Sequence, residues 1–191
     1  MKIGIFGGSF DPPHYGHLLV AEEAWQELNL EKVYFVPAGW QWLKPRELTL
    51  AHHRWEMLRR AIADDPYFDL CRFEIDRSRP SYTVETMAYF EETYPGAELY
   101  FILGWDALAE LPRWHEPQRL LELCHLVAVP RPGVEAPRGV EERLPGLKER
   151  LIWLNQPIVD LDSTQLRLRV AQGRSLRYRV PPTVAVAAWR A

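Results

Sequence analysis

Short apolar segments of strand type recur along the chain and alternate with longer stretches of mixed polarity. The strand-like segments cover residues 3–6, 33–36, 68–73, 99–103 and 126–129. Nearly uninterrupted apolar strands of this kind are buried on both faces, which is typical of a parallel sheet with right-handed helical crossovers. The pattern therefore predicts an alternation of strands and helices.

Two of the stretches between strands place their apolar residues on one helical face. These residues are Leu18, Ala21, Trp25 and Leu28 in the first stretch, and Leu50, Met57, Leu58, Ala61 and Ile62 in the second. Near the C-terminus, Ser163 is expected to cap a helix over residues 164–172 that ends at Gly173. Pro182 is expected to begin a second short helix.

These elements predict one domain over residues 1–191, an α/β fold with a Rossmann-like, doubly wound parallel sheet of five to six strands flanked by helices. A small helical segment over about 160–191 follows the sheet. A chain of 191 residues is long enough to bury one substantial core. Ligands of such sheets bind beyond the C-terminal ends of the strands, and most loops with candidate chemistry follow a predicted strand.

Composition narrows the classes of function. The formal net charge of −3 argues against a broad basic face for nucleic acid polymers. Cys71 and Cys124 lie far apart, which disfavours a disulfide framework or a thiolate metal site. The N-terminus lacks the pattern of a signal peptide, and the longest uncharged apolar stretch, 184–189, is too short to span a membrane. We therefore expect a soluble, cytoplasmic protein with neither membrane nor nucleic acid partners.

The strongest chemical signal is the segment 7–17, GGSFDPPHYGH, between the first predicted strand and the first predicted helix. Gly7 and Gly8 allow a sharp turn and a close backbone approach to a ligand, with N–H groups available to phosphate oxygens. His14 and His17 open the helix, where unpaired amides and the dipole already favour an anion. Since they are three residues apart, both imidazoles face one side and can bind one polyphosphate.

Two other readings of this segment remain open from the residues alone. In one, the glycines form a plain turn and the histidines cap the helix. In the other, Asp11, His14 and His17 bind the metal of a hydrolase. The rest of the chain has no matching set of ligands, since the remaining histidines are adjacent or isolated: His52, His53, His115 and His125. The spacing matches neither the dinucleotide-binding glycine motif nor the Walker motif.

Six further segments accompany this loop: 53–58 (HRWEML), 80–83 (PSYT), 104–106 (GWD), 111–114 (LPRW), 131–133 (RPG) and 163–167 (STQLR). With them, the chain resembles over nearly its whole length the bacterial nicotinate-nucleotide adenylyltransferases, members of the nucleotidylyltransferase superfamily with the H-x-G-H motif. The resemblance implies transfer of AMP from ATP to nicotinate mononucleotide in NAD biosynthesis, forming nicotinate adenine dinucleotide and pyrophosphate. It also implies Mg²⁺ as the cofactor that accompanies ATP.

The predicted ATP site combines this resemblance with residue chemistry. Its members are Gly7, Gly8, Ser9, His14, His17, Gly104, Asp106, Arg131, Ser163, Thr164 and Arg167. Asp106 is expected to accept hydrogen bonds from ribose hydroxyls, and Arg131 follows a strand and is placed to reach a nucleotide. Ser163 and Arg167 have the composition of a second phosphate clamp. Helix caps and solvated arginines are the plainer alternatives for these residues.

The predicted mononucleotide site consists of Ser9, Phe10, Lys44, Ser81, Tyr82, Thr83, Trp114 and His115. The resemblance places the backbone of Thr83, which follows a hairpin-like segment, near the nicotinate carboxylate. Trp114 would stack on the pyridine ring, although core packing is the alternative. The predicted catalytic residues are His17, which stabilises the transition state, and His14 and Lys44, which hold the polyphosphate. No protein-held metal is predicted.

The chain departs from the family pattern at three places. Residues 41–44 read Gln-Trp-Leu-Lys where the family usually has P-P-H-K, His115 replaces a common tyrosine, and Asp162 stands where a serine or threonine is frequent. Three alternative substrates share the loop: nicotinamide mononucleotide, phosphopantetheine, and a polyol phosphate with CTP. A nucleotide-binding regulator without turnover is a further alternative, and a homo-oligomer is compatible with the sequence.

Overall fold

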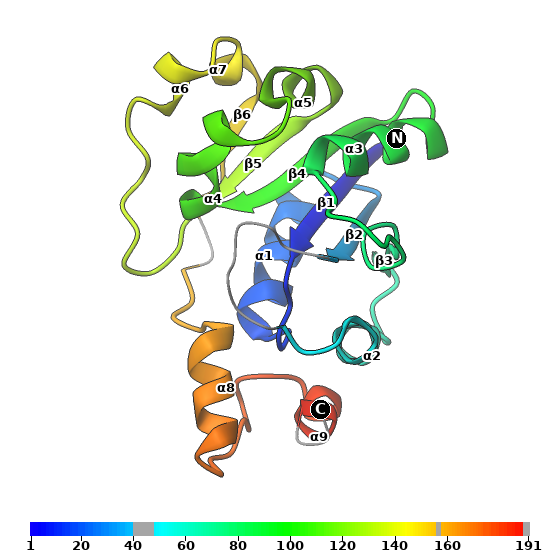
Figure 1. Cartoon of the computed structure of the whole chain (residues 1–191), viewed down its shortest axis with the longest axis vertical. Helices are drawn as coiled ribbons and strands as arrows, with labels where there is room; N and C mark the ends of the chain where they lie inside the picture. The colour runs from blue at the N-terminus through cyan, green and yellow to red at the C-terminus, as the bar shows by residue number, and fades with distance from the viewer. Residues whose placement is uncertain (40–47, 156–157, 189–191) are drawn as a thin grey trace.

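The computed structural model describes residues 1–39, 48–155 and 158–188, and a six-stranded parallel sheet forms its centre (Figure 1). The strand order is β3-β2-β1-β4-β5-β6, and every neighbouring pair is parallel. The strands are β1 Lys2–Gly8, β2 Lys32–Pro37, β3 Phe68–Leu70, β4 Glu98–Gly104, β5 His125–Val129 and β6 Leu151–Trp153. The order reverses beside β1, the point where doubly wound sheets bind ligands. The predicted α/β fold class is confirmed.

Helices connect the strands and continue beyond them. Their bounds are α1 Tyr15–Glu27, α2 Ala51–Ala61, α3 Thr83–Thr93, α4 Trp105–Glu110, the 3₁₀ helix η1 Leu111–Arg113, α5 Pro117–Leu123, α6 Val140–Arg143, α7 Leu147–Arg150, α8 Ser163–Ala171 and α9 Pro182–Ala188. Figure 1 shows α8 and α9 beyond the C-terminal ends of the strands, with α9 beside α2. Within the described residues, no helix has both the length and the apolar character needed to cross a membrane.

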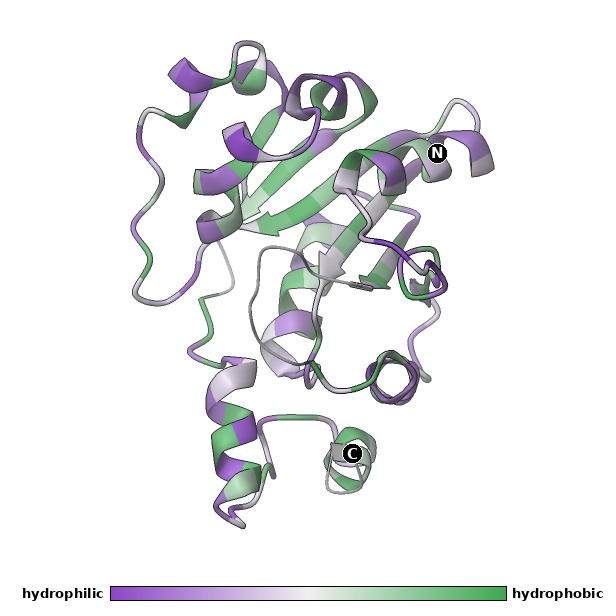
Figure 2. Cartoon of the chain, in the orientation of Figure 1, coloured by the Kyte–Doolittle hydropathy of each residue, from purple (hydrophilic) through white to green (hydrophobic). Residues whose placement is uncertain are grey.

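Each face of the sheet has its own hydrophobic core, because side chains alternate along the strands. On β1, Ile3 and Ile5 join a cluster with α3 to α7, whereas Phe6 joins a cluster with α1 and α2. The same alternation divides Phe101 from Ile102 on β4. The strands are accordingly the most continuously hydrophobic elements of the chain (Figure 2).

A third hydrophobic cluster fixes the C-terminal helices to the domain. It consists of Met57 from α2, Leu166 from α8, Val184 from α9, and Leu176 and Val180 from the connection between the two C-terminal helices. In addition, the Thr183 hydroxyl donates a hydrogen bond to the Arg60 carbonyl of α2 at 3.0 Å. The segment after β6 is therefore packed on α2 instead of trailing from the sheet.

The structure corrects two predicted elements. β3 ends at Leu70 and not at residue 73, because the chain turns away from β2 once the backbone N–H of Cys71 has bonded to Phe35. It pairs only with β2, in parallel, so Thr83 follows no hairpin and is instead the first residue of α3.

Two predicted end residues of helices are also corrected. Leu50 is the N-cap of α2 and is 64% exposed, since it precedes the first turn and does not belong to the buried stripe. α8 is capped by Asp162 and not by Ser163, because the Asp162 carboxylate accepts the hydrogen bonds of the first helical amides. The predicted helix from Pro182 is present as α9.

The third cluster can be tested with a matched pair of leucines. Leu176→Ala removes a side chain that is 1% exposed, so the free energy of unfolding should fall by about 2–5 kcal/mol. Leu168→Ala, at a position that is 49% exposed on α8, should change it by less than about 0.5 kcal/mol. Urea unfolding of both variants measures the difference. Equal effects would contradict the packing of the C-terminal helices on α2.

Candidate functional site

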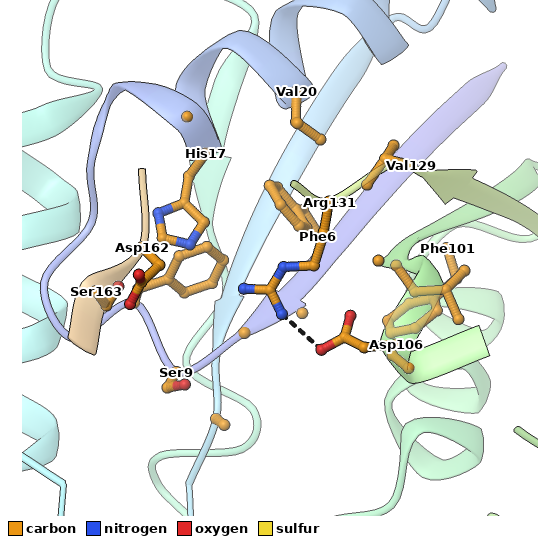
Figure 3. A pocket seen from close by; sticks show the side chains of 18 of the residues that line it. Phe6, Ser9, His17, Val20, Phe101, Asp106, Val129, Arg131, Asp162 and Ser163 are labelled. Atoms are coloured by element: carbon orange, nitrogen blue, oxygen red, sulfur yellow. Dashed lines mark hydrogen bonds and ion pairs between the residues drawn. The ribbon is translucent and has the colours of Figure 1, made fainter. Parts of the chain in front are cut away.

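A cavity of about 700 Å³ lies beyond the C-terminal ends of β1, β4 and β5 (Figure 3). It falls within the usual range for small-molecule sites. The predicted residues that line it are Gly7, Gly8, Ser9, Phe10, His14, His17, Ser81, Tyr82, Thr83, Gly104, Asp106, Trp114, His115, Arg131, Ser163 and Thr164. Arg167 lies outside the lining, and Lys44 and the rest of 41–44 lie outside the described residues. One cavity thus collects both predicted subsites.

Phe10 packs against His17 in the lining of the cavity. Its ring is 1% exposed, its φ of 48° lies in the left-handed region, and it meets His17 edge-on at 5.0 Å. A Cβ on Gly8 would come within 3.0 Å of the Phe10 ring, so the loop needs glycine there. Phe10 was predicted to contact a mononucleotide; its ring packs in the core against His17, and the residue also lines the cavity.

A buried arginine holds the start of the β1–α1 loop. Arg54 of α2 is 2% exposed and donates hydrogen bonds to the carbonyls of Ser9 at 3.0 Å and Thr49 at 2.8 Å. Its guanidinium thereby joins the glycine-rich loop to the beginning of α2. The sequence motif contained Arg54, but no role was predicted for it, because an arginine this deeply buried is rare.

Helix α8 holds the next part of the same loop. Arg167 donates to the Asp11 carbonyl at 2.6 Å and to the Thr164 hydroxyl at 3.1 Å. The Ser163 hydroxyl donates to the Pro12 carbonyl at 2.9 Å. Both side chains were predicted to bind phosphate, and in this structure both contact the loop backbone.

His14 and His17 form a stacked pair with ring centroids 3.7 Å apart. The backbone N–H of His14 donates to Nδ1 of His17 at 3.2 Å. Because Nδ1 accepts, a neutral His17 carries its proton on Nε2 and is a hydrogen-bond donor there. A Cβ on Gly16 would come within 2.9 Å of Nδ1 of His14, which explains the glycine between the two histidines.

Both histidines are neutral near pH 7. Burial lowers the pKa of His14 from 6.5 to about 4; the charge of Arg131 lowers it further, while that of Asp162 opposes the shift. Burial also holds the pKa of His17 well below 6.5, and the charges of His14 and Arg131 act in the same direction. The pair therefore offers hydrogen bonds to an anion without bringing a net charge.

Arg131 and Asp106 form an ion pair in the lining of the cavity. Nη1 of Arg131 lies 2.6 Å from Oδ2 of Asp106, and both side chains are about half exposed (Figure 3). A Cβ on Gly104 would come within 2.6 Å of Asp106 Oδ1 and 2.9 Å of Arg131 Cδ, so glycine is needed for this pair. Asp106 is the second residue of α4 and not its N-cap.

Aromatic side chains also line the cavity. Trp114 packs partly against the core and meets Phe101 edge-on at 6.1 Å while still lining the cavity. Tyr82 and His115 stack with centroids 4.2 Å apart. Among the described residues, Ser81 Oγ is buried without a hydrogen-bond partner. Together, these side chains suit a flat ring with polar substituents.

The sequence analysis missed Glu74 as a cavity residue. Its carboxylate accepts a hydrogen bond from the Thr86 hydroxyl at 2.8 Å, and burial raises its pKa to about 7 despite that bond and one from the Gly39 N–H. Glu74 stands in a charged stretch without a motif, so only its burial in the fold distinguishes it.

The charged groups of the described cavity wall are mainly acidic. Arg131 is the guanidinium of the lining, and the carboxyl groups are Glu74, Asp106, Glu110 and Asp162. No cluster of three or more metal-binding side chains exists among the described residues. Such a wall fits Mg²⁺ carried mainly by nucleotide phosphates and water, as this ion commonly binds, and not a protein cage.

Comparison with known proteins gives a consistent result. The cytidylyltransferase-like family model matches residues 5–169. A protein from Roseiflexus sp. (strain RS-1) named probable nicotinate-nucleotide adenylyltransferase is 49% identical, over 95% of this chain and 92% of its own length. One from Dehalococcoides mccartyi (strain CBDB1) with the same name is 43% identical, over 97% and 93%.

Solved structures share the fold. Nicotinic acid mononucleotide adenylyltransferase from Plasmodium falciparum, complexed with NaAD, superimposes with a TM-score of 0.82 and 20% identity, covering 99% of this chain and 95% of that one. Its complex with APC gives a TM-score of 0.80 and covers 99% and 94%.

The lowered pKa of His14 predicts a pH-dependent stability. Between pH 6.5 and about 4 the unfolded chain binds a proton at His14 that the folded protein does not, so stability falls as the pH falls. Between about pH 7 and about pH 5.5, the free energy of unfolding of wild type should fall by about 1 kcal/mol more than that of His14→Gln. Urea unfolding at both pH values measures this, with His115→Gln at an exposed position as the control. A loss in His14→Gln equal to that of wild type would contradict it.

Proposed function

Because the chain belongs to the nicotinate-nucleotide adenylyltransferases, within the cytidylyltransferase-like family, we propose that it transfers AMP from ATP to nicotinate mononucleotide. The products are nicotinate adenine dinucleotide and pyrophosphate, a step of NAD biosynthesis. The family assignment makes the protein a nucleotidyltransferase. A cytoplasmic location and a homo-oligomeric state stay predictions.

One observation carries the proposal: the stacked histidines and Trp114 line one and the same cavity. Arg131 and Asp106 lie beside them at the ends of β5 and β4. A triphosphate at the histidines and a pyridine ring at the tryptophan would bring two phosphates together in between. The relatives above are named as adenylyltransferases of nicotinate mononucleotide. This arrangement would fit the same substrate.

The reaction needs no protein nucleophile. An oxygen of the mononucleotide 5′-phosphate attacks the α-phosphorus of ATP, and the bond from that phosphorus to the oxygen bridging to the β-phosphate breaks. The attacking group is already an anion, so no base has to remove a proton. Catalysis then consists of alignment and of stabilising charge in the transition state.

The histidines suit that task because they are neutral donors at fixed positions. Nε2–H of His17 would donate to an oxygen of the α-phosphate, where charge is redistributed in the transition state. His14 would bind the polyphosphate beside it. Phe10 and the backbone of His14 hold His17 in place before the substrate enters, so little reorganisation is needed.

The negative charge of the triphosphate requires cations, because the charged groups of the described cavity wall are mainly acidic. Lys44, which lies outside the described residues, is proposed to contact the β- and γ-phosphates. Mg²⁺ bound to the phosphates would supply further neutralisation of the triphosphate. Arg131 would be drawn from Asp106 toward a phosphate, leaving the Asp106 carboxylate to accept hydrogen bonds from the adenosine ribose.

The mononucleotide would lie between Trp114 and the start of α3. The Trp114 face would stack on the pyridine ring, and the backbone amide of Thr83, at the N-terminus of α3, would meet the nicotinate carboxylate. A carboxylate gains more from a helix N-terminus than a neutral amide does. This arrangement favours nicotinate over nicotinamide mononucleotide.

The proposed catalytic role of His17 predicts a large loss of rate. With ATP, Mg²⁺ and nicotinate mononucleotide, His17→Ala should lower kcat for pyrophosphate release about 10²–10³-fold, the usual effect of removing one transition-state donor. His52→Ala, at an exposed position of α2, should leave the rate unchanged.

Nicotinamide mononucleotide is the comparison substrate in the same assay and should react more slowly. If nicotinamide mononucleotide reacted faster, the contacts proposed for Thr83 and Trp114 would be wrong. If wild type bound ATP but released no pyrophosphate with either mononucleotide, the pyridine-nucleotide assignment would be wrong.

Stacking on Trp114 predicts a change confined to one substrate. Trp114→Ala should raise KM for nicotinate mononucleotide about 10- to 100-fold, the range expected for loss of one base–aromatic stack, while KM for ATP stays near the wild-type value. Trp114→Phe should recover part of the loss. Trp153→Ala, at a position that is 38% exposed and outside the cavity, is the control. A parallel rise of both KM values would show that Trp114 acts only through the fold.

A further inference from the structure

Asp162 lies at the edge of the cavity, immediately before α8. In Figure 3 its carboxylate is close to Ser163 and on the same side of the cavity as His17. Oδ1 accepts hydrogen bonds from the backbone N–H groups of Thr164 at 2.7 Å and Gln165 at 3.0 Å. One carboxylate oxygen therefore takes up two of the first amides of the helix.

Amides at the start of a helix are groups that can bind a phosphate. The first N–H groups of a helix have no partner within the helix, and they bind phosphate or sulfate readily. α8 spans nine residues, and its first two, Ser163 and Thr164, line the cavity. A carboxylate oxygen resembles a phosphate oxygen in charge and in hydrogen-bonding capacity, so Asp162 fills the place of an anion.

His14 is an independent sign that the cavity binds a ligand. His14 is 4% exposed and lines the cavity, and its Nδ1 has no hydrogen-bond partner among the described residues. Buried polar atoms without a partner are rare in folded proteins and usually mark a ligand, water or functional role. The charge of Asp162 acts on His14, since it raises the pKa of that imidazole.

We propose that Asp162 lowers the affinity for ATP, because a negatively charged cap competes with the triphosphate at the first turn of α8. With no nucleotide bound, the carboxylate occupies the amides of Thr164 and Gln165. When the triphosphate enters, the carboxylate has to leave these amides or remain beside a second anion. The inference rests on the proposed function, because it takes ATP to be the ligand of this end of the cavity.

Charge makes the competition unfavourable to the nucleotide. The other carboxyl groups of the described wall are Glu110, Asp106, which is paired with Arg131, and Glu74, whose pKa burial raises to about 7. ATP brings further negative charge. Two anions at one helix N-terminus repel each other more strongly in a partly enclosed cavity than in water. A neutral cap at position 162 would keep the helix start and remove the repulsion.

The test is binding of ATP with Mg²⁺, without mononucleotide, measured by isothermal titration calorimetry. Asp162→Ser and Asp162→Asn keep a good cap and remove the charge. Both should bind ATP about 5- to 30-fold more tightly than wild type. Asp160→Asn makes the same change of charge two residues earlier, at an exposed position outside the main cavity, and should change the affinity less than about twofold.

Salt dependence separates charge from a purely structural effect. The gain in affinity of Asp162→Ser over wild type should shrink as the salt concentration rises, because screening weakens repulsion. Equal or weaker binding by both variants would overturn the competition and leave adenylyl transfer untouched. The competition would also be overturned if Asp160→Asn gained as much affinity for ATP as Asp162→Ser, or if salt did not reduce the gain of Asp162→Ser. Absence of ATP binding in every protein, wild type included, would overturn the proposed function and the competition with it.

Discussion

The rest of the site depends on how the backbone carbonyls of the β1–α1 loop are satisfied. This loop is buried, and buried backbone carbonyls need hydrogen-bond donors. Arg54, Ser163 and Arg167 meet this need, each donating to one carbonyl of the loop, at Ser9, Pro12 and Asp11 in turn. The position of the histidines that follow depends on these three bonds.

Electrostatics in the cavity follow from burial more than from the number of charged residues. The two imidazoles are neutral near pH 7 because burial lowers their pKa and the charge of Arg131 acts in the same direction. Arg131 itself is paired with Asp106. The described wall of the cavity therefore brings little positive charge of its own. By the proposed function, cations would have to accompany the triphosphate, and Mg²⁺ and Lys44 would supply them.

The sequence predicted the sheet and the residues around the cavity well, because both depend on local patterns. Strands such as 99–103 are apolar whichever strands they pair with, and loops after parallel strands meet at one edge. The contacts of Arg54 and Arg167 were not predictable in this way, since they join residues 45 and 156 positions apart. Ser163 and Asp162 are equally good caps by propensity, so only the backbone geometry of α8 decides between them.

The C-terminal helices belong to the site although they contribute no strand. Met57 of α2 and Leu166 of α8 meet in one hydrophobic cluster, and these two helices carry the arginines that hold the β1–α1 loop. That cluster therefore fixes the spacing between Arg54 and Arg167, and with it the shape of the loop. A charged cap at Asp162 gives α8 a defined start even when no nucleotide is present. By our proposal, the same charge opposes the phosphate that the helix N-terminus would attract. Asp162 therefore stabilises the start of α8 and at the same time lowers the affinity for ATP.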